Sequence, residues 1–242
     1  MPTVGMVGAG QLARMTAQAA IALGQSLRVL AVRPDDPAAQ VCADVVLGRP
    51  DNLDALRTLA RGCAVVTLDH EQVPAGHLQA LVDAGLPVRP GPNALRHAQD
   101  KLLMRRRLAA AGIAVPAFAP VTSPADLGRF AAEHGPRVVL KAVHGGYDGR
   151  GVWMLDQPDS ALVTRLRQAG TPLLVEAAVS MRRELAALVA RSPYGQAAAY
   201  PVVETVQVDG QCAEVLAPAP GLAEDTALAA QHLALRIATE LD

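Results

Sequence analysis

Aromatic residues are scarce in this chain of 242 residues, because phenylalanine, tryptophan and tyrosine together make up 2% of it. So few rings leave almost no platform on which the bases of a single-stranded nucleic acid can stack. The net charge of −1 gives no electrostatic attraction to nucleic acid or to anionic lipid. We therefore expect no nucleic-acid partner and no membrane partner.

Cysteine is also rare, and long hydrophobic runs are missing. Cys42, Cys63 and Cys212 are odd in number and far apart, which fits neither a disulfide framework nor a metal site. No apolar run approaches the ~20 residues of a membrane span, and the chain starts with a strand-like segment rather than a basic secretory leader. These patterns predict a soluble protein of a reducing, cytoplasmic compartment.

Hydrophobic residues, in contrast, make up 51% of the chain, which excludes disorder and allows a large core. In the first ninety residues apolar runs alternate with helical patterns, which predicts a doubly wound, Rossmann-like parallel sheet of α/β class. The expected strands are Val4–Val7, Leu27–Val32, Val45–Leu47 and Ala64–Leu68. The expected helices are Gln11–Leu23, Asn52–Ala60 with Asp51 as its N-cap, and Gln79–Ala84.

Three prolines between Leu86 and Pro92 predict a domain boundary there, so we expect one domain over residues 1–91 and a second over residues 92–242. The second is expected to open with one helix over Asn93–Ala110 and to be of α+β class. Its further expected elements are strands Phe118–Thr122, Arg137–Lys141, Val152–Leu155 and Pro172–Glu176, helices Pro124–His134 and Ser160–Gln168, an antiparallel sheet within Glu184–Leu216 and a helix over Leu222–Leu241.

Two glycine-rich segments are candidate anion sites. The first, Gly8 to Ala13, matches G-x-G-x-x-[GA] after a strand, where glycines let a phosphate approach a helix N-terminus. An NAD-dependent oxidoreductase is the alternative that this motif raises, but Arg33 stands near the end of the second strand, where such proteins place an acid. A tight structural turn without NAD explains this first motif better.

The second segment, His144 to Gly151, has four glycines within seven positions between two strands. Its backbone amides can wrap phosphate oxygens, and Lys141 at the end of the preceding strand can reach the same anion. Lysine is otherwise used once more, at Lys101 in the helix after the boundary. Arg105, Arg106 and Arg107 on that helix are expected to be solvated, and for Glu176 and Glu184 a solvated strand-end acid and a site residue stay equally open.

Taken in order, the two lysines, the glycine loop and the two glutamates resemble the ATP-grasp superfamily. More closely, the chain resembles the N5-carboxyaminoimidazole ribonucleotide synthetase family. The motifs that carry this resemblance are Gly10–Met15, Gln99–Lys101, Gly145–Gly151 and Tyr200–Glu204. The resemblance implies an ATP-dependent, carbon–nitrogen bond-forming ligase that uses ATP, Mg2+, bicarbonate and aminoimidazole ribonucleotide in purine biosynthesis, and a homodimer when the chain is full length.

The resemblance also implies roles for individual residues. Lys101 and Lys141 would contact ATP phosphates, with Lys141 and Arg150 as the catalytic cations. The remaining nucleotide contacts would be Gly146, Tyr147, Asp148, Gly149, Arg150, Gly151, the hinge Glu176, Ala177, Ala178 and Val179, the ribose-binding Glu184, and Gln207. Aminoimidazole ribonucleotide would contact Glu71, Tyr147, Asp148 and Arg150.

Family chains continue well beyond the position of Asp242, and that further part carries the carboxylates expected to hold Mg2+. We therefore expect a C-terminally truncated, incomplete ATP-grasp domain whose metal ligands are unknown. A non-catalytic nucleotide-binding fragment stays open as an alternative to an active enzyme. Strand edges left unpaired predict that residues beyond about Glu184 are less stable than those before them.

Overall fold

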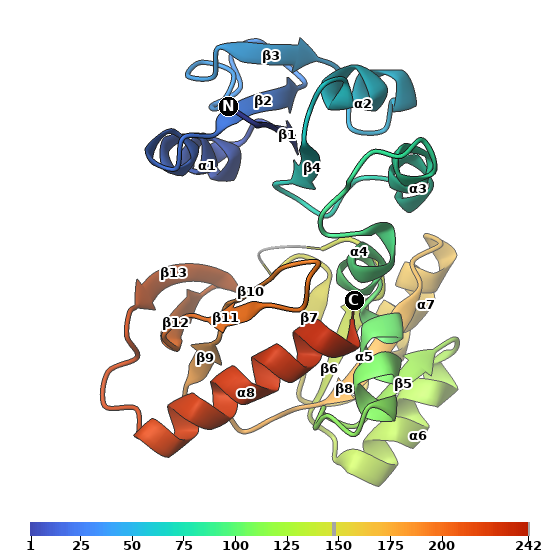
Figure 1. Cartoon of the computed structure of the whole chain (residues 1–242). Helices are drawn as coiled ribbons and strands as arrows, with labels where there is room; N and C mark the ends of the chain where they lie inside the picture. Colours follow the sequence, from blue (N-terminus) through green and yellow to red (C-terminus); the bar gives the residue numbers. More distant parts are fainter. Residues whose placement is uncertain (147–148, 242) are drawn as a thin grey trace. The chain divides into compact units, whose positions relative to one another are not determined.

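The computed structural model describes residues 1–146 and 149–241, which form two compact units (Figure 1). The first unit is Met1–Gln99, and the second begins at Asp100. Helix α4 (Pro92–Gln99) packs against α3 (Ala75–Asp83) and so belongs to the first unit. The expected boundary after residue 91 had placed this helix in the second domain.

The first unit is a parallel sheet with helices on both faces. Its strands β1 (Thr3–Val7), β2 (Ser26–Ala31), β3 (Asp44–Leu47) and β4 (Val65–Leu68) lie in the order β3-β2-β1-β4. Helix α1 (Gln11–Ala22) covers one face, where Ala13 packs with Met6 and Val29. Helices α2 (Leu53–Ala60) and α3 cover the other face, where Leu56 and Leu78 pack among the strands. The doubly wound sheet predicted from the sequence is confirmed.

Two helix starts in this unit differ from the prediction. Asn52, not Asp51, caps α2, because the Asn52 side-chain oxygen accepts hydrogen bonds from the amides of Asp54 and Ala55 at 2.9 and 3.2 Å. Asp51 instead pairs with Arg49 at 2.9 Å. Helix α3 begins at Ala75, four residues before the predicted start at Gln79, directly after a proline.

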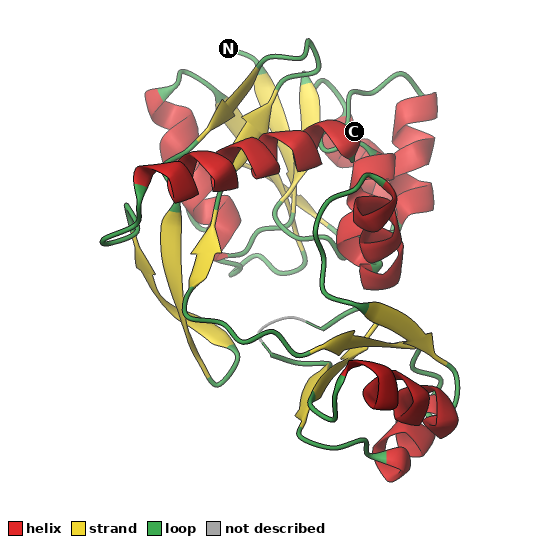
Figure 2. Ribbon diagram, turned by 90° about the horizontal axis from the view of Figure 1, so that it is seen from below, coloured by secondary structure: helices red, strands yellow, loops and turns green. Residues whose placement is uncertain are grey.

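The second unit contains an antiparallel sheet of four strands in the order β5-β8-β6-β7. The strands are β5 (Phe118–Val121), β6 (Val138–Ala142), β7 (Val152–Leu155) and β8 (Leu173–Ala177). Helices α6 (Pro124–His134) and α7 (Ser160–Gln168) cover one face (Figure 2), and their buried side chains pack with those of the strands. Side chains alternate between the two faces along a strand. The neighbours of the buried residues on β6 and β8 therefore point to the face that α6 and α7 do not cover.

The predicted helix over Asn93–Ala110 is two helices, α4 and α5 (Lys101–Ala110). Asp100 interrupts them, since its backbone is extended and its carboxylate accepts a hydrogen bond from the Leu103 amide at 2.8 Å. The same residue forms an isolated β-bridge with His144. The single-helix prediction was wrong because the apolar periodicity continues through a residue that caps rather than propagates a helix.

The remaining strands form two small antiparallel groups, as the sequence predicted for Glu184–Leu216. Strands β9 (Glu184–Ala186), β12 (Val203–Val208) and β13 (Gln211–Leu216) form a sheet in the order β13-β12-β9, and β10 (Val189–Arg191) pairs with β11 (Ala197–Ala199). Helix α8 (Glu224–Glu240) contacts β10 and β11 (Figure 1). Within the described part of the chain, no helix has the length and apolar character needed to cross a membrane.

Candidate functional site

A buried carboxylate held by two cations lies at the centre of the candidate site. Among residues 1–146 and 149–241, Glu176 is the one buried charged residue, with 3% of its surface exposed. Its Oε1 atom lies 2.6 Å from Arg105 Nε, and its Oε2 atom lies 2.6 Å from Lys141 Nζ. Burial of a charge is tolerated only where partners compensate it, and here each carboxylate oxygen has its own cation.

The register of the sheet explains why Lys141 and Glu176 meet. Val139 on β6 pairs with Glu176 on β8, and Lys141 pairs with Leu174, so Lys141 is a diagonal neighbour of Glu176. Both side chains lie on the face opposite the one that α6 and α7 cover, where Leu140 and Val175 are buried. The expected site residues Lys141 and Glu176 are thus brought together by strand pairing alone.

Arg105 was missed by the sequence reasoning, which assigned it to a solvated face together with Arg106 and Arg107. Its side chain is 20% exposed and donates to Glu176, whereas Arg106 is exposed. Arg107 instead pairs with Glu240 at 2.9 Å. A signal was present, because Arg105 stands four residues after Lys101 and so occupies the same helix face.

The electrostatics of Glu176 reflect a balance of opposing effects. Burial would raise the pKa of this carboxyl group, but the hydrogen bonds from Lys141 and Arg105 and their positive charges lower it below its ordinary value. Glu176 is therefore ionised at neutral pH. Two cations and one anion give the cluster a net positive charge of one, a property suited to binding an anion.

The glycine loop connects β6 with β7 next to this cluster. Lys101, the first residue of α5, donates a hydrogen bond from Nζ to the Gly145 carbonyl at 2.7 Å. The Lys101 amide donates to the Val143 carbonyl at 3.0 Å, and the Ala142 amide donates to the Gly151 carbonyl at 2.8 Å. Helix α5 and both ends of the loop are therefore fixed to the strand that carries Lys141.

The backbone of this loop requires glycine. Gly146 has a φ of +77°, and a Cβ atom there would lie 2.4 Å from the Arg150 carbonyl oxygen. Gly149 also has a φ of +77°, and its Cβ would lie 3.1 Å from Gly210 Cα at the turn between β12 and β13. Gly146 is thus packed tightly against the backbone at Arg150, and Gly149 against the turn between β12 and β13.

The other expected site residues lie in the glycine loop, at the end of β8 and on β9 and β12. Arg150 is exposed in the loop, and Tyr147 and Asp148 lie outside the described residues. In the expected hinge, Ala177 is the last residue of β8, and the Ala178 amide donates a hydrogen bond to the Arg137 carbonyl at 3.4 Å. Val179, the next residue, is 58% exposed. Glu184 begins β9 and is half-buried, and Gln207 is exposed on β12 beside a register shift in its pairing with β13.

Glu71 is the expected substrate contact from the first unit. It follows β4, in a segment whose backbone carbonyls accept hydrogen bonds. Gln99 donates from Nε2 to the carbonyls of Glu71 and Val73, each at 2.7 Å. The Val73 amide also donates to the Glu71 carbonyl at 2.9 Å. The Gln99 side chain, part of the motif that carries the family resemblance, therefore holds the strand end on which Glu71 stands.

The first glycine motif is filled by a carboxylate of the chain itself. Asp69, whose side chain is 6% exposed, accepts a hydrogen bond from the Gly10 amide at 3.1 Å through Oδ2. A Cβ atom on Gly8 would lie 1.7 Å from Asp69 Oδ1. A dinucleotide phosphate at this helix N-terminus would meet a negative charge, so the geometry disfavours the NAD alternative and favours a structural turn.

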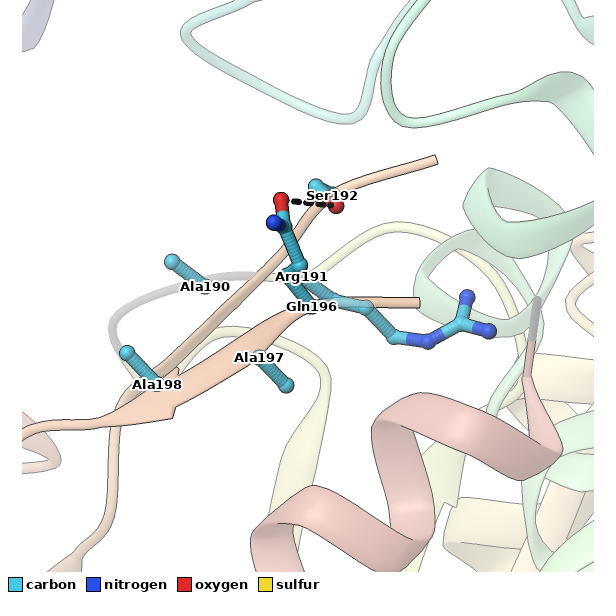
Figure 3. A pocket seen from close by; sticks show the side chains of 6 residues that line it. All are labelled: Ala190, Arg191, Ser192, Gln196, Ala197 and Ala198. Carbon is cyan, nitrogen blue, oxygen red and sulfur yellow. Dashed lines mark hydrogen bonds between the residues drawn. The ribbon is translucent and has the colours of Figure 1, made fainter. Parts of the chain in front are cut away.

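A shallow hollow of about 400 Å³ lies elsewhere, on the β10–β11 hairpin (Figure 3). It is lined by Ala190, Arg191, Ser192, Gln196, Ala197 and Ala198. The Ser192 hydroxyl lies 3.3 Å from Gln196 Oε1, while the Arg191 side chain extends away from that pair. None of these residues belongs to the set expected from the sequence, so the hollow is not the candidate site.

Mg2+ binds in proteins through carboxylate and other oxygen ligands. Across residues 1–146 and 149–241, no three histidine, cysteine, aspartate or glutamate side chains come close enough together to hold a metal ion. Glu176 is already satisfied by two cations and is a poor metal ligand as it stands. The described residues therefore offer no ready set of ligands for the ion.

Comparison with known proteins gives two family matches. Residues 1–99 match the ribonucleotide synthetase preATP-grasp domain, and residues 106–242 match the ATP-grasp domain. The N5-carboxyaminoimidazole ribonucleotide synthase of Mycobacterium tuberculosis is 58% identical over 242 residues, which cover 99% of this chain and 56% of that protein. The chain thus spans a little over half the length of this curated relative.

Solved structures agree with this result. The carboxyaminoimidazole ribonucleotide synthase of Aspergillus clavatus complexed with ATP has a TM-score of 0.90 at 30% identity, over 100% of this chain and 63% of that one. The enzyme of the same organism in complex with ADP and 5-aminoimidazole ribonucleotide has a TM-score of 0.89 at 29% identity, with the same coverage. The chain therefore belongs to the ATP-grasp family, in which it is similar to the N5-carboxyaminoimidazole ribonucleotide synthases, as its motifs predicted.

Proposed function

We propose that the second unit binds ATP and that the chain is part of an enzyme that carboxylates 5-aminoimidazole ribonucleotide. One observation carries the proposal: Lys101, Arg105 and Lys141 come from a helix and a strand that are joined to one glycine loop. Relatives of 58% and 30% identity bear the name of this enzyme, and the latter was solved with ATP. The activity, substrates and partners of the whole protein remain part of the proposal.

The proposed reaction has two steps. A bicarbonate oxygen attacks the γ phosphorus of ATP, the bond from that phosphorus to the ADP oxygen breaks, and carboxyphosphate and ADP form. The exocyclic amine of aminoimidazole ribonucleotide then bonds to the carboxyl carbon, phosphate leaves with the electron pair of the breaking carbon–oxygen bond, and the amine loses one proton. The products are N5-carboxyaminoimidazole ribonucleotide, ADP and phosphate.

The protein side chains in this scheme position and stabilise charge. Lys101 and Lys141 are proposed to contact the phosphates, with Lys141 and Arg150 stabilising the charge that develops during transfer. Amides of the Gly146–Gly151 loop would bind phosphate oxygens, the hinge Glu176–Val179 the adenine edge, and Glu184 the ribose hydroxyls. Glu71 and Arg150 would contact the aminoimidazole ribonucleotide, and Gln207 would contribute a hydrogen bond.

The test is ADP release by this 242-residue chain in the presence of Mg-ATP and bicarbonate, with and without aminoimidazole ribonucleotide. ADP release that depends on the ribonucleotide supports the carboxylation. ATP binding without any release supports the second candidate, a nucleotide-binding fragment without turnover. A chain that is folded by circular dichroism but does not bind ATP contradicts both.

Localisation and assembly belong to the same proposal. The family resemblance supports a cytoplasmic enzyme that acts as a homodimer when full length. Light scattering of the longer protein would give the mass of two chains if the proposal holds. A monomer at micromolar concentration would contradict it.

A further inference from the structure

The cluster of Arg105, Lys141 and Glu176 has a feature that direct contact with a nucleotide does not explain. Glu176 places a negative charge beside Lys141, one of the cations proposed to meet the phosphates. A carboxylate this close opposes an incoming triphosphate. The Lys141 ammonium group also donates a hydrogen bond to Glu176. To bind the ligand, it must turn at least one of its N–H groups toward a phosphate.

Arg105 forms an ion pair with that carboxylate and balances its charge. Its guanidinium holds Oε1 of Glu176 through Nε, while Lys141 holds Oε2. Arginine stays charged at all accessible pH values and binds in a fixed plane, whereas lysine has a flexible stem and three rotatable donors. The two cations are therefore unequal, and Lys141 is the one suited to move.

We propose that Arg105 is a positioning residue for nucleotide binding. It keeps the charge of Glu176 neutralised, so that Lys141 can pass from the Glu176 carboxylate to a phosphate of ATP without leaving an unpaired buried anion. Arg105 itself stays on Glu176 throughout. This inference rests on the proposed ATP site, and its test separates the two.

The test measures the affinity of the 242-residue chain for Mg-ATP by calorimetry at pH 7.5. Binding by the unaltered chain is required first, and its absence would contradict the proposed function rather than the role of Arg105. Arg105→Met is expected to weaken ATP binding about tenfold or more, because the uncompensated Glu176 retains Lys141 and repels the phosphates. Arg105→Lys keeps the charge and should stay within about threefold of the unaltered chain.

Two further variants separate positioning from a general structural effect. Arg106→Met removes an exposed arginine from the same helix and should leave ATP affinity unchanged. The double variant Arg105→Met/Glu176→Gln removes the cation together with the charge that it compensates. Its affinity should return most of the way to that of Glu176→Gln alone, which is a coupling that simple loss of helix packing does not produce.

The pH profile gives an independent readout. In Arg105→Met the buried Glu176 loses one compensating cation, so its proton affinity rises and it becomes neutral at a higher pH. The affinity of this variant relative to the unaltered chain should therefore improve as the pH falls from 8 to 5. Taking the ratio cancels the titration of ATP itself.

Several outcomes overturn the proposal. These are equal losses in Arg105→Met and Arg106→Met, a double variant as weak as Arg105→Met, or an affinity ratio that does not change with pH. If Arg105→Met does not fold, the ATP affinities of Arg105→Lys and of the double variant test the proposal instead. Arg105→Lys keeps a cation beside Glu176, and the double variant removes the negative charge of Glu176. Loss of ATP binding in either of these two, while folded, contradicts the proposal, and its retention supports it.

Discussion

Asp69 accepts a hydrogen bond from the amide of Gly10 at 3.1 Å, so a carboxylate of the chain occupies the helix N-terminus that a dinucleotide phosphate would use. The contact joins the end of β4 to the start of α1. Glycines between a first strand and a helix can leave room either for an external anion or for a side chain of the same protein. The hydrogen bond from Gly10 to Asp69 shows that a side chain takes this place here. Here the Asp69 side chain is 6% exposed, which favours a structural turn over an external anion.

Replacing Gly8 with alanine should therefore destabilise the first unit. The new Cβ would lie 1.7 Å from Asp69 Oδ1, and Gly8 has a φ of +115°, so both overlap and backbone strain oppose the substitution. We expect a loss of about 3 kcal/mol in the free energy of unfolding, measured by urea denaturation.

Gly76 provides the matched control for this measurement. It lies in α3, in the same unit, and a Cβ there would meet nothing within 4 Å. Gly76→Ala should stabilise the chain by roughly 0.5 kcal/mol. Equal effects of the two substitutions would show that Asp69 does not constrain Gly8.

Lys101 is predicted to contribute to ATP binding more than to stability. Its Nζ atom donates a hydrogen bond to the carbonyl of Gly145 in the glycine loop, and an exposed hydrogen bond of this kind adds little to folding. Lys101→Met should weaken Mg-ATP binding about tenfold, with a change in the free energy of unfolding below about 1 kcal/mol. A fluorescent ATP analogue measures the first quantity and thermal denaturation the second; unchanged affinity would remove Lys101 from the proposed site.

Much of this site was predictable from the order of residues along the chain. The glycine loop is recognisable from its four glycines between two strands, and Lys141 and Glu176 each stand near the end of an apolar run that forms a strand, β6 and β8. Arg105 was not recognised, because three successive arginines on a helix read as a solvated face until the burial of each is known. Only the antiparallel register of β6 and β8 shows that a lysine and a glutamate 35 residues apart share one face.

The fold was predicted well where hydrophobic periodicity determines it and less well where a single polar side chain does. Asn52 rather than Asp51 caps α2, since Arg49 already binds Asp51. Asp100 divides one predicted helix into two, since its carboxylate binds the amide of Leu103. In both cases a hydrogen bond from a backbone amide to one polar side chain sets the start of a helix, and hydrophobic periodicity does not reveal it.

Glu176 should make stability depend on pH in the acidic range. Its pKa in the folded chain is lowered from the ordinary value of 4.5, so the folded state binds the proton less readily than the unfolded state. The stabilisation is therefore fully present above pH 4.5 and is lost as the pH falls through the lower, folded pKa.

Glu176→Gln should show this loss directly. We expect it to cost on the order of 2 kcal/mol at pH 7, less than a fully buried pair because both cations remain partly solvated. The gap to the unaltered chain should close below pH 4.5 in denaturation measured at several pH values. Glu133→Gln on α6, where the side chain is 75% exposed, should show no such gap; a pH-independent gap for Glu176→Gln would contradict the ion-pair explanation.

The part of the chain beyond Glu184 should exchange its amide hydrogens faster than the β5–β8 sheet. Strand β13 is almost entirely exposed, and none of the residues of α8, all of them described, is buried, whereas β8 is buried along most of its length. Few buried apolar contacts allow local opening at low free-energy cost. Hydrogen exchange followed by mass spectrometry should show protection in β6 and β8 that outlasts that in β12, β13 and α8.

Helix α8 is held by polar contacts, since none of its residues is buried. Arg107 binds the Glu240 carboxylate at 2.9 Å and its carbonyl at 2.8 Å, and Arg236 donates to the Ala111 carbonyl. Arg107→Ala should therefore accelerate exchange in α8 and leave α6 unchanged, while Arg106→Ala should alter neither. Uniformly slow exchange from Glu184 to Leu216 in the unaltered chain would contradict the lower stability of this region, because exposed strands would then open no more easily than buried ones.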